Sequence, residues 1–499
     1  MNPATPAASV LLSRRPGSRE VYAILRGRQL RFFGGFWAFP GGKLAEQDLH
    51  HANGDPLHAR RLAACRELFE EVGVLIARDD AGNLLADSSQ FEPFRQSVLD
   101  ETLPFAEFLA RNRWTIRDTD FPLIGEITTP KFTPVRFATT FFSAQLPPGQ
   151  EANVVPGELE LGEWTTPEAL LARWHTGEVL VTPPSAMSLE ILAGHPIDEA
   201  PARLGPTFRH LAAGAIHPIY LAPCVQMIPL RTVALPPSTH TSAVYIGNGP
   251  RYLIDPGPRE ADEQQRFFNI LDEQKHTGRG MSAIVLSHQH PDHVDAATIC
   301  ADRYHVPIWA HPRTAKLLEG QVRVDRLLHD GDRLDLGASP ADGRPWHLDV
   351  LHTPGHASGH LAFFEPVYRI LMACDMISTV TSMVIAPPDG NIADYLASLR
   401  RLRELPTRIL LPAHGAISTD PTKLIDAAIE HRGKRERQLL DTLSDTPIDI
   451  DALTALLYRG TPESLMRFAR AQVHAGLLKL QQEGRAEQVN EESWRDVRI

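Results

Sequence analysis

Short apolar runs near the start of the chain predict strands, and a longer periodic pattern after them predicts a helix. The runs at 8–12, 21–25 and 36–39 are apolar and bounded by polar residues, Gly or Pro, as buried strands are. Over 57–77 the apolar residues recur every three or four positions instead. This pattern predicts an amphipathic helix that ends at Gly73 or shortly after.

The remainder of the first half continues to mix helices and strands. A helical insert is expected over 85–120, and strands are expected at 123–127 and 136–142. A further helix near 167–174 has Thr165 or Thr166 as its expected N-cap.

A second series of elements begins after 200–225, a stretch with many Pro, Gly and His residues and no clear periodicity. Helices then alternate with buried strands until about residue 420, and the last 80 residues are mostly helical. The sequence therefore predicts an α/β protein with four parts, which are residues 1–200, a linker over 201–225, residues 226–420 and a tail over 421–499.

Composition places the chain among ordinary globular proteins. It has 499 residues, of which 43% are hydrophobic and 22% charged, so at least two cores are expected. No stretch approaches 18 uncharged apolar residues, and the first apolar run is too short for a secretory signal, so no membrane association is expected. The four cysteines are widely spaced, which excludes a disulfide framework and favours a cytoplasmic protein.

The charge balance argues against a protein that mainly coats nucleic acid. There are 50 Lys and Arg residues against 61 Asp and Glu residues, for a net charge of −11, although a local basic groove remains compatible with these numbers. The chain also has 22 histidines, several of them clustered, and neutral imidazole is a common metal ligand.

The strongest chemical signal follows an apolar strand at 283–286. Within six positions the chain places His288, His290, Asp292 and His293, three imidazoles and one carboxylate. Such ligands suit zinc, and also iron or manganese. Histidines in polar loops are common without a metal, but this density directly after a buried strand favours a metal site.

Three further ligand-type residues follow predicted strands in the same half. They are His356 after 348–351, Asp375 after 370–374 and His414 after 409–413. This ordered set, with the earlier motif, resembles the metallo-β-lactamase superfamily over 226–420. The resemblance implies a four-layer αββα sandwich with the metals at one edge.

The resemblance also assigns the ligands to two Zn²⁺ ions, or to iron or manganese. It places His288, His290 and His356 on one ion, Asp292, His293 and His414 on the other, and Asp375 between them, with Asp255 supporting the site from outside. Two such cations activate a water molecule and polarise the bond under attack, while Asp292 acts in catalysis by orienting the nucleophile. A bridging carboxylate resembles thioesterase-type and nuclease-type members more than true β-lactamases.

The tail resembles the winged-helix tail of the subgroup called lactamase-beta-2, some of whose members cut single-stranded RNA. Over 421–499 there are 12 Lys and Arg residues and 13 Asp and Glu residues, so the tail is not basic as a whole. Only Arg432, Lys434, Arg435 and Arg437 cluster. The tail is therefore interpreted either as a helical cap or dimer contact, or as a contact for an anionic polymer.

The first half carries a second candidate site on its predicted helix. Glu67, Glu70 and Glu71 lie at i, i+3 and i+4, so all three project from one helix face, where their charges repel. A hard cation such as Mg²⁺ or Mn²⁺ relieves this repulsion. A solvated acidic helix face is the alternative.

With Gly42, Asp48 and the segment 66–74, these glutamates resemble the Nudix box. The chain departs from the box by having Asp48 in place of the usual Glu and about ten extra residues between Gly42 and Arg66, as in the coenzyme A diphosphatase subgroup. The resemblance, over about 5–200, implies an α/β/α sandwich that hydrolyses diphosphates with Mg²⁺ or Mn²⁺. Glu70 and Glu71 are then the main ligands, Glu67 a ligand or base, and Arg66 an orienting partner. An inactive Nudix domain that only binds is the alternative.

Two functions follow from these resemblances. The first is a bifunctional metal-dependent hydrolase of small molecules, with a coenzyme A or nucleotide derivative as substrate. A coenzyme A thioester would engage both centres, its ester in the second half and its diphosphate in the first. The second is an endoribonuclease that processes single-stranded RNA, with the Nudix half binding a nucleotide end. Two complete sets of candidate metal ligands argue against a non-enzymatic interaction protein. The sequence leaves the oligomeric state open.

Overall fold

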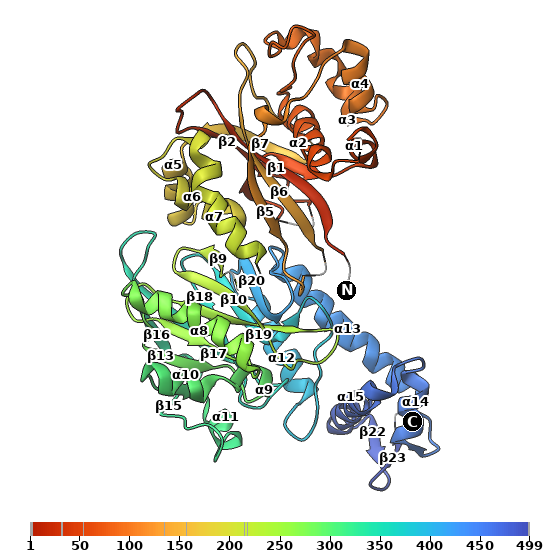
Figure 1. The fold of residues 1–499 in the computed structure, drawn as a ribbon. Coiled ribbons are helices and arrows are strands. Elements are labelled where there is room, and N and C mark those ends of the chain that lie inside the picture. Colours follow the sequence, from red (N-terminus) through yellow and green to blue (C-terminus); the bar gives the residue numbers. More distant parts are fainter. Residues whose placement is uncertain are drawn as a thin grey trace. The chain divides into compact units, whose positions relative to one another are not determined.

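The computed structural model describes residues 3–30, 33–52, 54–133, 135–155, 157–213, 215–216 and 218–497. The chain forms two compact units, residues 1–223 and 224–499 (Figure 1). Each unit has its own sheets and its own hydrophobic core, so each is described by itself.

The first unit is built on one mixed sheet with the strand order β5-β6-β1-β2-β3-β8, in which β4 also pairs with β1 and β7 with β2. Strands β1 and β6 are parallel, with Ala8 opposite Thr140, and most other pairs are antiparallel. The strands are β1 (Thr5–Ser13), β2 (Val21–Arg26), β3 (Phe36–Ala38), β4 (Gly41–Lys43), β5 (Leu123–Thr128), β6 (Phe137–Gln145), β7 (Leu159–Thr165) and β8 (Leu180–Val181).

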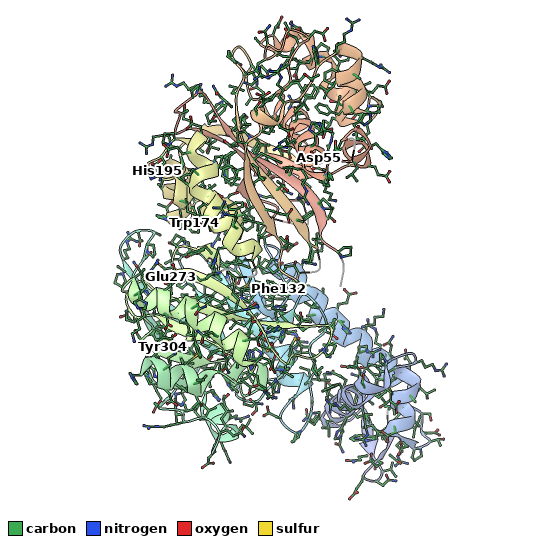
Figure 2. The ribbon with its side chains drawn as sticks, in the orientation of Figure 1. Asp55, Phe132, Trp174, His195, Glu273 and Tyr304 are labelled. Atoms are coloured by element: carbon green, nitrogen blue, oxygen red, sulfur yellow. The ribbon has the colours of Figure 1, made fainter. Side chains whose placement is uncertain are left out.

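Helix α2 (Pro56–Val72) carries the glutamates and packs against β1. It begins at Asp55, labelled in Figure 2, whose carboxylate accepts hydrogen bonds from the amides of Leu57 and His58. It ends at Gly73, whose φ of 72° is the left-handed conformation that glycine adopts most easily. The predicted helix end at Gly73 is therefore confirmed.

The remaining helices of this unit include the expected insert. Short helices occupy much of 85–120, and Thr166 is the N-cap of α5, as predicted. These helices are α1 (Glu46–His51), α3 (Arg95–Leu99), α4 (Phe105–Asn112), α5 (Pro167–His175), α6 (Pro183–Leu192) and α7 (Ala200–Ala212).

The predicted linker over 201–225 is wrong for its first part, because 200–212 form the regular helix α7. Pro206 and the neighbouring Gly205 suggested a loop, but Leu204 and Phe208 are buried on one helix face. The Phe208 ring lies 5.2 Å from that of Phe141, edge to face. Tertiary packing therefore outweighs the unfavourable helix propensity of Pro and Gly. Strand β9 (Ile219–Ala222) follows.

The second unit contains two larger sheets. Strands β10 to β15 lie in the order β15-β14-β13-β12-β11-β10, and the other sheet has the order β16-β17-β18-β19-β20. Their bounds are β10 (Val225–Arg231), β11 (His240–Ile246), β12 (Tyr252–Ile254), β13 (Ala283–Leu286), β14 (Ile308–Ala310), β15 (Arg326–Leu327), β16 (Arg333–Ala338), β17 (Pro345–His352), β18 (Leu361–Glu365), β19 (Ile370–Ser378) and β20 (Ile409–His414).

Helices cover the two sheets of this unit from outside. Helices α8 and α10 contact the first sheet, α13 contacts β19, and the two sheets contact each other through β11 and β20. The layer order of helix, sheet, sheet and helix agrees with the expected sandwich. The helices are α8 (Ala261–His276), α9 (Pro291–Val294), α10 (Ala297–Tyr304), α11 (Pro312–Leu317), α12 (Ile392–Arg403) and α13 (Pro421–Thr442).

The tail contains more than helices. Helices α14 (Ile450–Leu457) and α15 (Glu463–Gln482) pack with a small antiparallel sheet made of β21 (Ile448–Asp449), β23 (Ser493–Asp496) and β22 (Ala486–Gln488). Leu453, Leu477 and Trp494 are fully buried in its core. None of the helices in the described part of the chain combines the length and the apolar surface that crossing a bilayer requires.

Candidate metal centre

The seven predicted ligands meet at one edge of the second unit because each follows, ends or lies within a strand there. His288, His290, Asp292 and His293 lie in the loop after β13 and in the short helix α9. The other three come from β17, β19 and β20 or from the loops that follow them. Residues far apart in the sequence thus converge, as the strand-end pattern predicts.

A first group consists of His288, His290, His356 and Asp375, whose ligand atoms all lie within 4.8 Å of one another. The Nδ1 atom of His290 is 2.9 Å from the Nε2 atoms of both His288 and His356. Oδ2 of Asp375 lies 3.3 Å from Nε2 of His356. Three imidazole nitrogens and one carboxylate oxygen therefore surround a single point.

A second group consists of Asp292, His293 and His414, again with ligand atoms within 4.8 Å. Oδ1 of Asp375 lies 3.4 Å from Nε2 of His293 and 3.3 Å from Nε2 of His414. Asp375 thus turns one oxygen toward each group. This is the arrangement expected of a carboxylate between two ions.

Most of these imidazoles are held at their other nitrogen. The partners are Oγ of Ser287 for His288 (2.9 Å), Oδ2 of Asp255 for His293 (2.8 Å), the Val384 carbonyl for His356 (2.7 Å) and the His240 carbonyl for His414 (3.0 Å). Such contacts fix the ring orientation and the tautomer, and so leave the facing nitrogen free to bind a metal.

Asp255 supports the centre from outside, as expected from the sequence. Besides His293, it accepts hydrogen bonds from the amide (2.7 Å) and the hydroxyl (2.6 Å) of Ser287. Gly257, two residues later, passes so close to the ligand loop that a Cβ there would lie 1.7 Å from the carbonyl oxygen of Asp292. Only glycine fits that position.

Charge is unevenly distributed between the two groups. Burial, together with the neighbouring imidazoles, lowers the pKa of His288 well below its ordinary value and that of His290 to about 4. Burial also acts to lower the pKa of His293. The neighbouring carboxylates of Asp375, Asp292 and Asp255 outweigh this effect and raise the pKa of His293 well above its ordinary value. The first group therefore presents neutral imidazoles, the form that binds a metal.

The donor set fits a pair of divalent cations. Nε2 of His293 and Oδ1 of Asp375 are buried and have no hydrogen-bond partner among the residues that the structure describes, and these two atoms are 3.4 Å apart. Buried polar groups are seldom left without a partner unless a further group belongs between them. Histidine nitrogens with carboxylate oxygens are the donors that zinc, iron and manganese accept.

Sequence reasoning missed two residues that contact the ligands. The fully buried His360 accepts a hydrogen bond from the amide of Asp375 (3.2 Å) at Nε2, and its Nδ1 lies 2.9 Å from Oγ1 of Thr353. The hydroxyl of Thr241 donates to Oδ2 of Asp292 (3.1 Å). The spacing of His360 four residues after His356 was the available signal for the first, whereas Thr241 gives none.

Two histidines without a predicted ligand role lie outside the centre. The rings of His352 and His311 stack 4.1 Å apart, and Nε2 of His352 lies 3.0 Å from the Ser358 carbonyl. His311 accepts a hydrogen bond from the amide of Arg313 at the start of α11. Both residues therefore have contacts of their own outside the predicted ligand set.

The first unit brings Glu67, Glu70 and Glu71 together on α2. Arg66 pairs with Glu70 (2.8 Å), Glu67 (2.9 Å) and Asp48 (3.1 Å). Burial raises the pKa of Glu70 to about 7, and it also raises the pKa values of the other two glutamates.

The glutamates also meet the predicted glycine turn. Glu71 accepts a hydrogen bond from the amide of Gly41 (2.8 Å). A Cβ on Gly42 would lie 2.3 Å from a carboxylate oxygen of Glu67. The residues singled out by the sequence in this half therefore form one cluster, in which Arg66 and Asp48 are buried and the glutamates are half-buried.

Comparison with known proteins assigns the second unit. Residues 235–414 match the Metallo-beta-lactamase superfamily, and residues 450–494 match the Beta-lactamase associated winged helix domain. The second unit therefore holds a metallo-beta-lactamase superfamily domain followed by this winged helix domain.

The relatives extend this assignment. Beta-lactamase-like protein 2 homolog from Drosophila melanogaster is 26% identical over 49% of this chain and 83% of that protein. Hydroxyacylglutathione hydrolase from Rhizobium meliloti is 32% identical over 30% of this chain and 58% of that protein. Acyl-coenzyme A thioesterase MBLAC2 from Gallus gallus is 36% identical over 19% of this chain and 32% of that protein. The protein is thus a hydrolase of the metallo-beta-lactamase superfamily.

Two solved structures each resemble a part of the chain. A Beta-lactamase domain protein from Burkholderia ambifaria is 19% identical, with a TM-score of 0.49, and covers 57% of this chain and 94% of its own. A NUDIX hydrolase from Alicyclobacillus acidocaldarius is 26% identical, with a TM-score of 0.34, and covers 41% of this chain and 98% of its own.

Proposed function

We propose that the second unit hydrolyses thioesters at a centre of two divalent cations. The observation that carries this proposal is the placement of Asp375, which turns one oxygen toward each histidine group. Two relatives bear the names of thioester-cleaving enzymes, hydroxyacylglutathione hydrolase and acyl-coenzyme A thioesterase. We assign His288, His290 and His356 to one cation and Asp292, His293 and His414 to the other.

Two bound cations would polarise a thioester carbonyl and lower the pKa of a water molecule. The chain's own residues set the geometry of that reaction. Asp375 spaces the two groups, and the contacts of Asp255, Val384 and the His240 carbonyl hold the imidazoles in place. Asp292, held at Oδ2 by the hydroxyl of Thr241, orients the attacking water with its carboxylate.

A substrate panel tests the proposal. Full-length protein loaded with Zn²⁺, Mn²⁺ or Fe²⁺ is incubated with acetyl-, octanoyl- and palmitoyl-coenzyme A and with lactoylglutathione, and the released thiol is measured. Thiol release that His290→Ala abolishes supports the proposal. Labelled single-stranded RNA is included as the alternative substrate. RNA cleavage that His290→Ala abolishes, with no thioester consumed, would overturn it in favour of an endoribonuclease.

We also propose that the first unit hydrolyses a diphosphate with Mg²⁺ or Mn²⁺, in the manner of a Nudix hydrolase. The contact of Glu71 and Glu67 with the turn at Gly41 and Gly42 supports this second activity, because it joins the two parts of the box. Carboxylate oxygens suit these cations. Glu70 and Glu71 would be the main ligands and Glu67 a ligand or base, while Arg66 orients Glu67 and Glu70.

Product analysis tests the second activity separately. Coenzyme A, ADP-ribose and a dinucleoside diphosphate are incubated with the protein and Mg²⁺, and the products are separated by chromatography. Cleavage that Glu70→Gln abolishes while His290→Ala leaves it intact supports the proposal. Binding of these compounds without cleavage would instead mark the unit as a binding scaffold.

A further inference from the structure

A cleft of about 700 Å³ lies within the second unit, between the loop 381–384 and helices α13 and α15. Tyr458, at the end of α14, closes one side of it. Figure 1 shows α13 as the long helix that leads to α14 and α15. This volume is in the range of pockets that hold small-molecule ligands.

The cleft adjoins the metal centre through two consecutive residues of its wall. The carbonyl of Val384 accepts the hydrogen bond from Nδ1 of His356 (2.7 Å). The carbonyl of Met383, one residue earlier, accepts from the Arg432 guanidinium of α13 and from Nε2 of Gln472 of α15 (3.4 Å). A molecule bound in this cleft therefore lies beside the segment that positions a candidate metal ligand.

One wall carries positive charge that no carboxylate of the described residues neutralises. Arg432 is only 8% exposed, and its contacts are neutral: Oε1 of Gln472 (2.8 Å), the Met383 carbonyl and the Tyr395 ring, whose centroid is 5.2 Å from the guanidinium carbon. A buried charge without a counterion is costly, so the site favours an anion.

Two further cations extend this wall. Arg435 stacks on the ring of Tyr458 at 4.1 Å and donates to Oε1 of Gln438 (2.9 Å), and Lys434 is exposed. In the described part of the chain, neither these two nor Arg432 is within ion-pair distance of a carboxylate. The positive wall is therefore available to a ligand.

The remaining charges of the cleft do not cancel this surplus. Glu430 and Glu436 also line it. Glu436 is already paired with Lys479 (2.6 Å) and Arg485 (2.7 Å). That leaves Glu430 alone against Arg432, Lys434 and Arg435, so the net charge facing the cleft is positive.

Aromatic side chains complete the lining. Tyr458 and Phe468 are half-buried, so part of each ring faces the cleft. Aromatic faces stack on nucleobases, and Arg and Lys bind phosphates. The combination favours a phosphorylated nucleoside over a plain carboxylate, which needs no aromatic surface.

We propose that this cleft binds the phosphorylated adenosine of a coenzyme A thioester, whose acyl end is cleaved at the neighbouring metal centre. The inference rests on the proposed thioesterase activity and identifies coenzyme A as the thiol carrier of the substrate. Arg432, Lys434 and Arg435 bind the phosphates, and Tyr458 and Phe468 contact the base.

A pair of substrates that differ only in the nucleotide tests the proposal. The full-length, metal-loaded protein is assayed with an acyl-coenzyme A and with the matching acyl-pantetheine, using the acyl group that it hydrolyses fastest. In the double variant Lys434→Gln with Arg435→Gln, the KM for the coenzyme A ester should rise about tenfold with kcat unchanged, because binding common to ground and transition states is lost. The KM for the pantetheine ester should not change.

Arg437→Gln is the matched control, since Arg437 is an exposed arginine on α13 outside the cleft lining. It should leave both KM values unchanged. An equal rise for the two esters in the double variant, or the same rise in the control, would overturn the cleft assignment while leaving thioester hydrolysis intact. If neither ester is hydrolysed, the proposed function itself fails.

Direct binding separates the carrier from other anions. Titration calorimetry of the full-length protein with free coenzyme A should give a dissociation constant that the double variant weakens about tenfold and Arg437→Gln does not. Binding of glutathione or of an oligouridylate that weakens in the double variant, with no binding of coenzyme A, would overturn the assignment to a phosphorylated adenosine.

Discussion

The two polar clusters of this protein are built in opposite ways. Glu67, Glu70 and Glu71 come from one helix and are compensated within the unit by Arg66. The histidine centre is assembled from several strand ends, and Nε2 of His293 and Oδ1 of Asp375 are left buried without a hydrogen-bond partner among the described residues. In the described part of the chain, no carboxylate oxygen of the three glutamates is left in that state.

This difference indicates which of the two clusters depends on a bound ion. A cluster with an internal arginine and carboxylates that can take up protons is neutralised without a metal. A centre with buried, unpartnered donors pointing at one another is incomplete without one. The second unit should therefore lose more stability and activity than the first when metal is removed, and four measurements test this contrast.

The largest effect is expected from Asp375→Asn. Bound metal ions supply several kcal/mol of transition-state stabilisation, so losing the carboxylate that we propose the two ions share should lower thioester hydrolysis at least about 1,000-fold. Plasma mass spectrometry should also find less metal per chain. The exposed Asp302→Asn is the control. Full metal content with unchanged thiol release in Asp375→Asn would break the contrast.

A smaller effect is expected on the stability of the first unit in the absence of metal, which should depend on pH. The pKa of Glu70 is about 7 in the folded unit against an ordinary 4.5, mainly because of burial. Between these values the folded unit holds a proton that the unfolded chain releases. The stability from this group is therefore complete below about pH 4.5 and is lost as the pH rises through 7, by at most about 3 kcal/mol.

Glu70→Gln isolates this contribution, because glutamine resembles the protonated form. Hydrogen exchange of α2, followed by mass spectrometry, should show equal protection in the two proteins near pH 4.5 and greater protection in the variant at pH 8. Mg²⁺ should reduce that gap at pH 8. A gap that does not change with pH would contradict the buried-carboxylate account.

The next effect concerns His360, which positions Asp375 through its backbone amide. His360→Ala should weaken metal binding about tenfold, as is usual for residues that orient ligands. Competition with a chromogenic chelator measures this affinity. His360→Gln keeps a hydrogen-bond acceptor and should recover part of it. Equal weakening in both variants would show that His360 only fills space.

The smallest effect is expected from Gly73→Ala, which alters the end of α2. The φ of 72° at Gly73 disfavours a side chain there, and an added Cβ would lie 2.7 Å from the Arg95 guanidinium. The first unit should lose about 1 kcal/mol of stability, measured by urea titration, while the metal content of the second unit is unchanged. Gly157→Ala, where a Cβ meets nothing within 4 Å, is the control.

Elements stabilised by interactions between neighbouring residues could be predicted from the sequence, whereas elements that depend on contacts between distant residues could not. The helix over α2 and its end at Gly73 follow from local periodicity and backbone preference, so they were predictable. Helix α7 was not, because the burial of Leu204 and Phe208 outweighs the local signal of Pro206. The strands of the tail, only two to four residues long, were missed because such short strands leave no clear alternation.

The chemical groups that this protein can use are evident from local sequence: imidazoles and carboxylates after buried strands, and three glutamates on one helix face. The way these groups are combined depends on the three-dimensional fold, because the strand order sets which loop ends meet. The fold placed Asp375 between two histidine groups, set His360 behind it and left Arg432, beside the cleft, without a counterion among the described residues. Such contacts join residues tens of positions apart, and no local pattern encodes their distances.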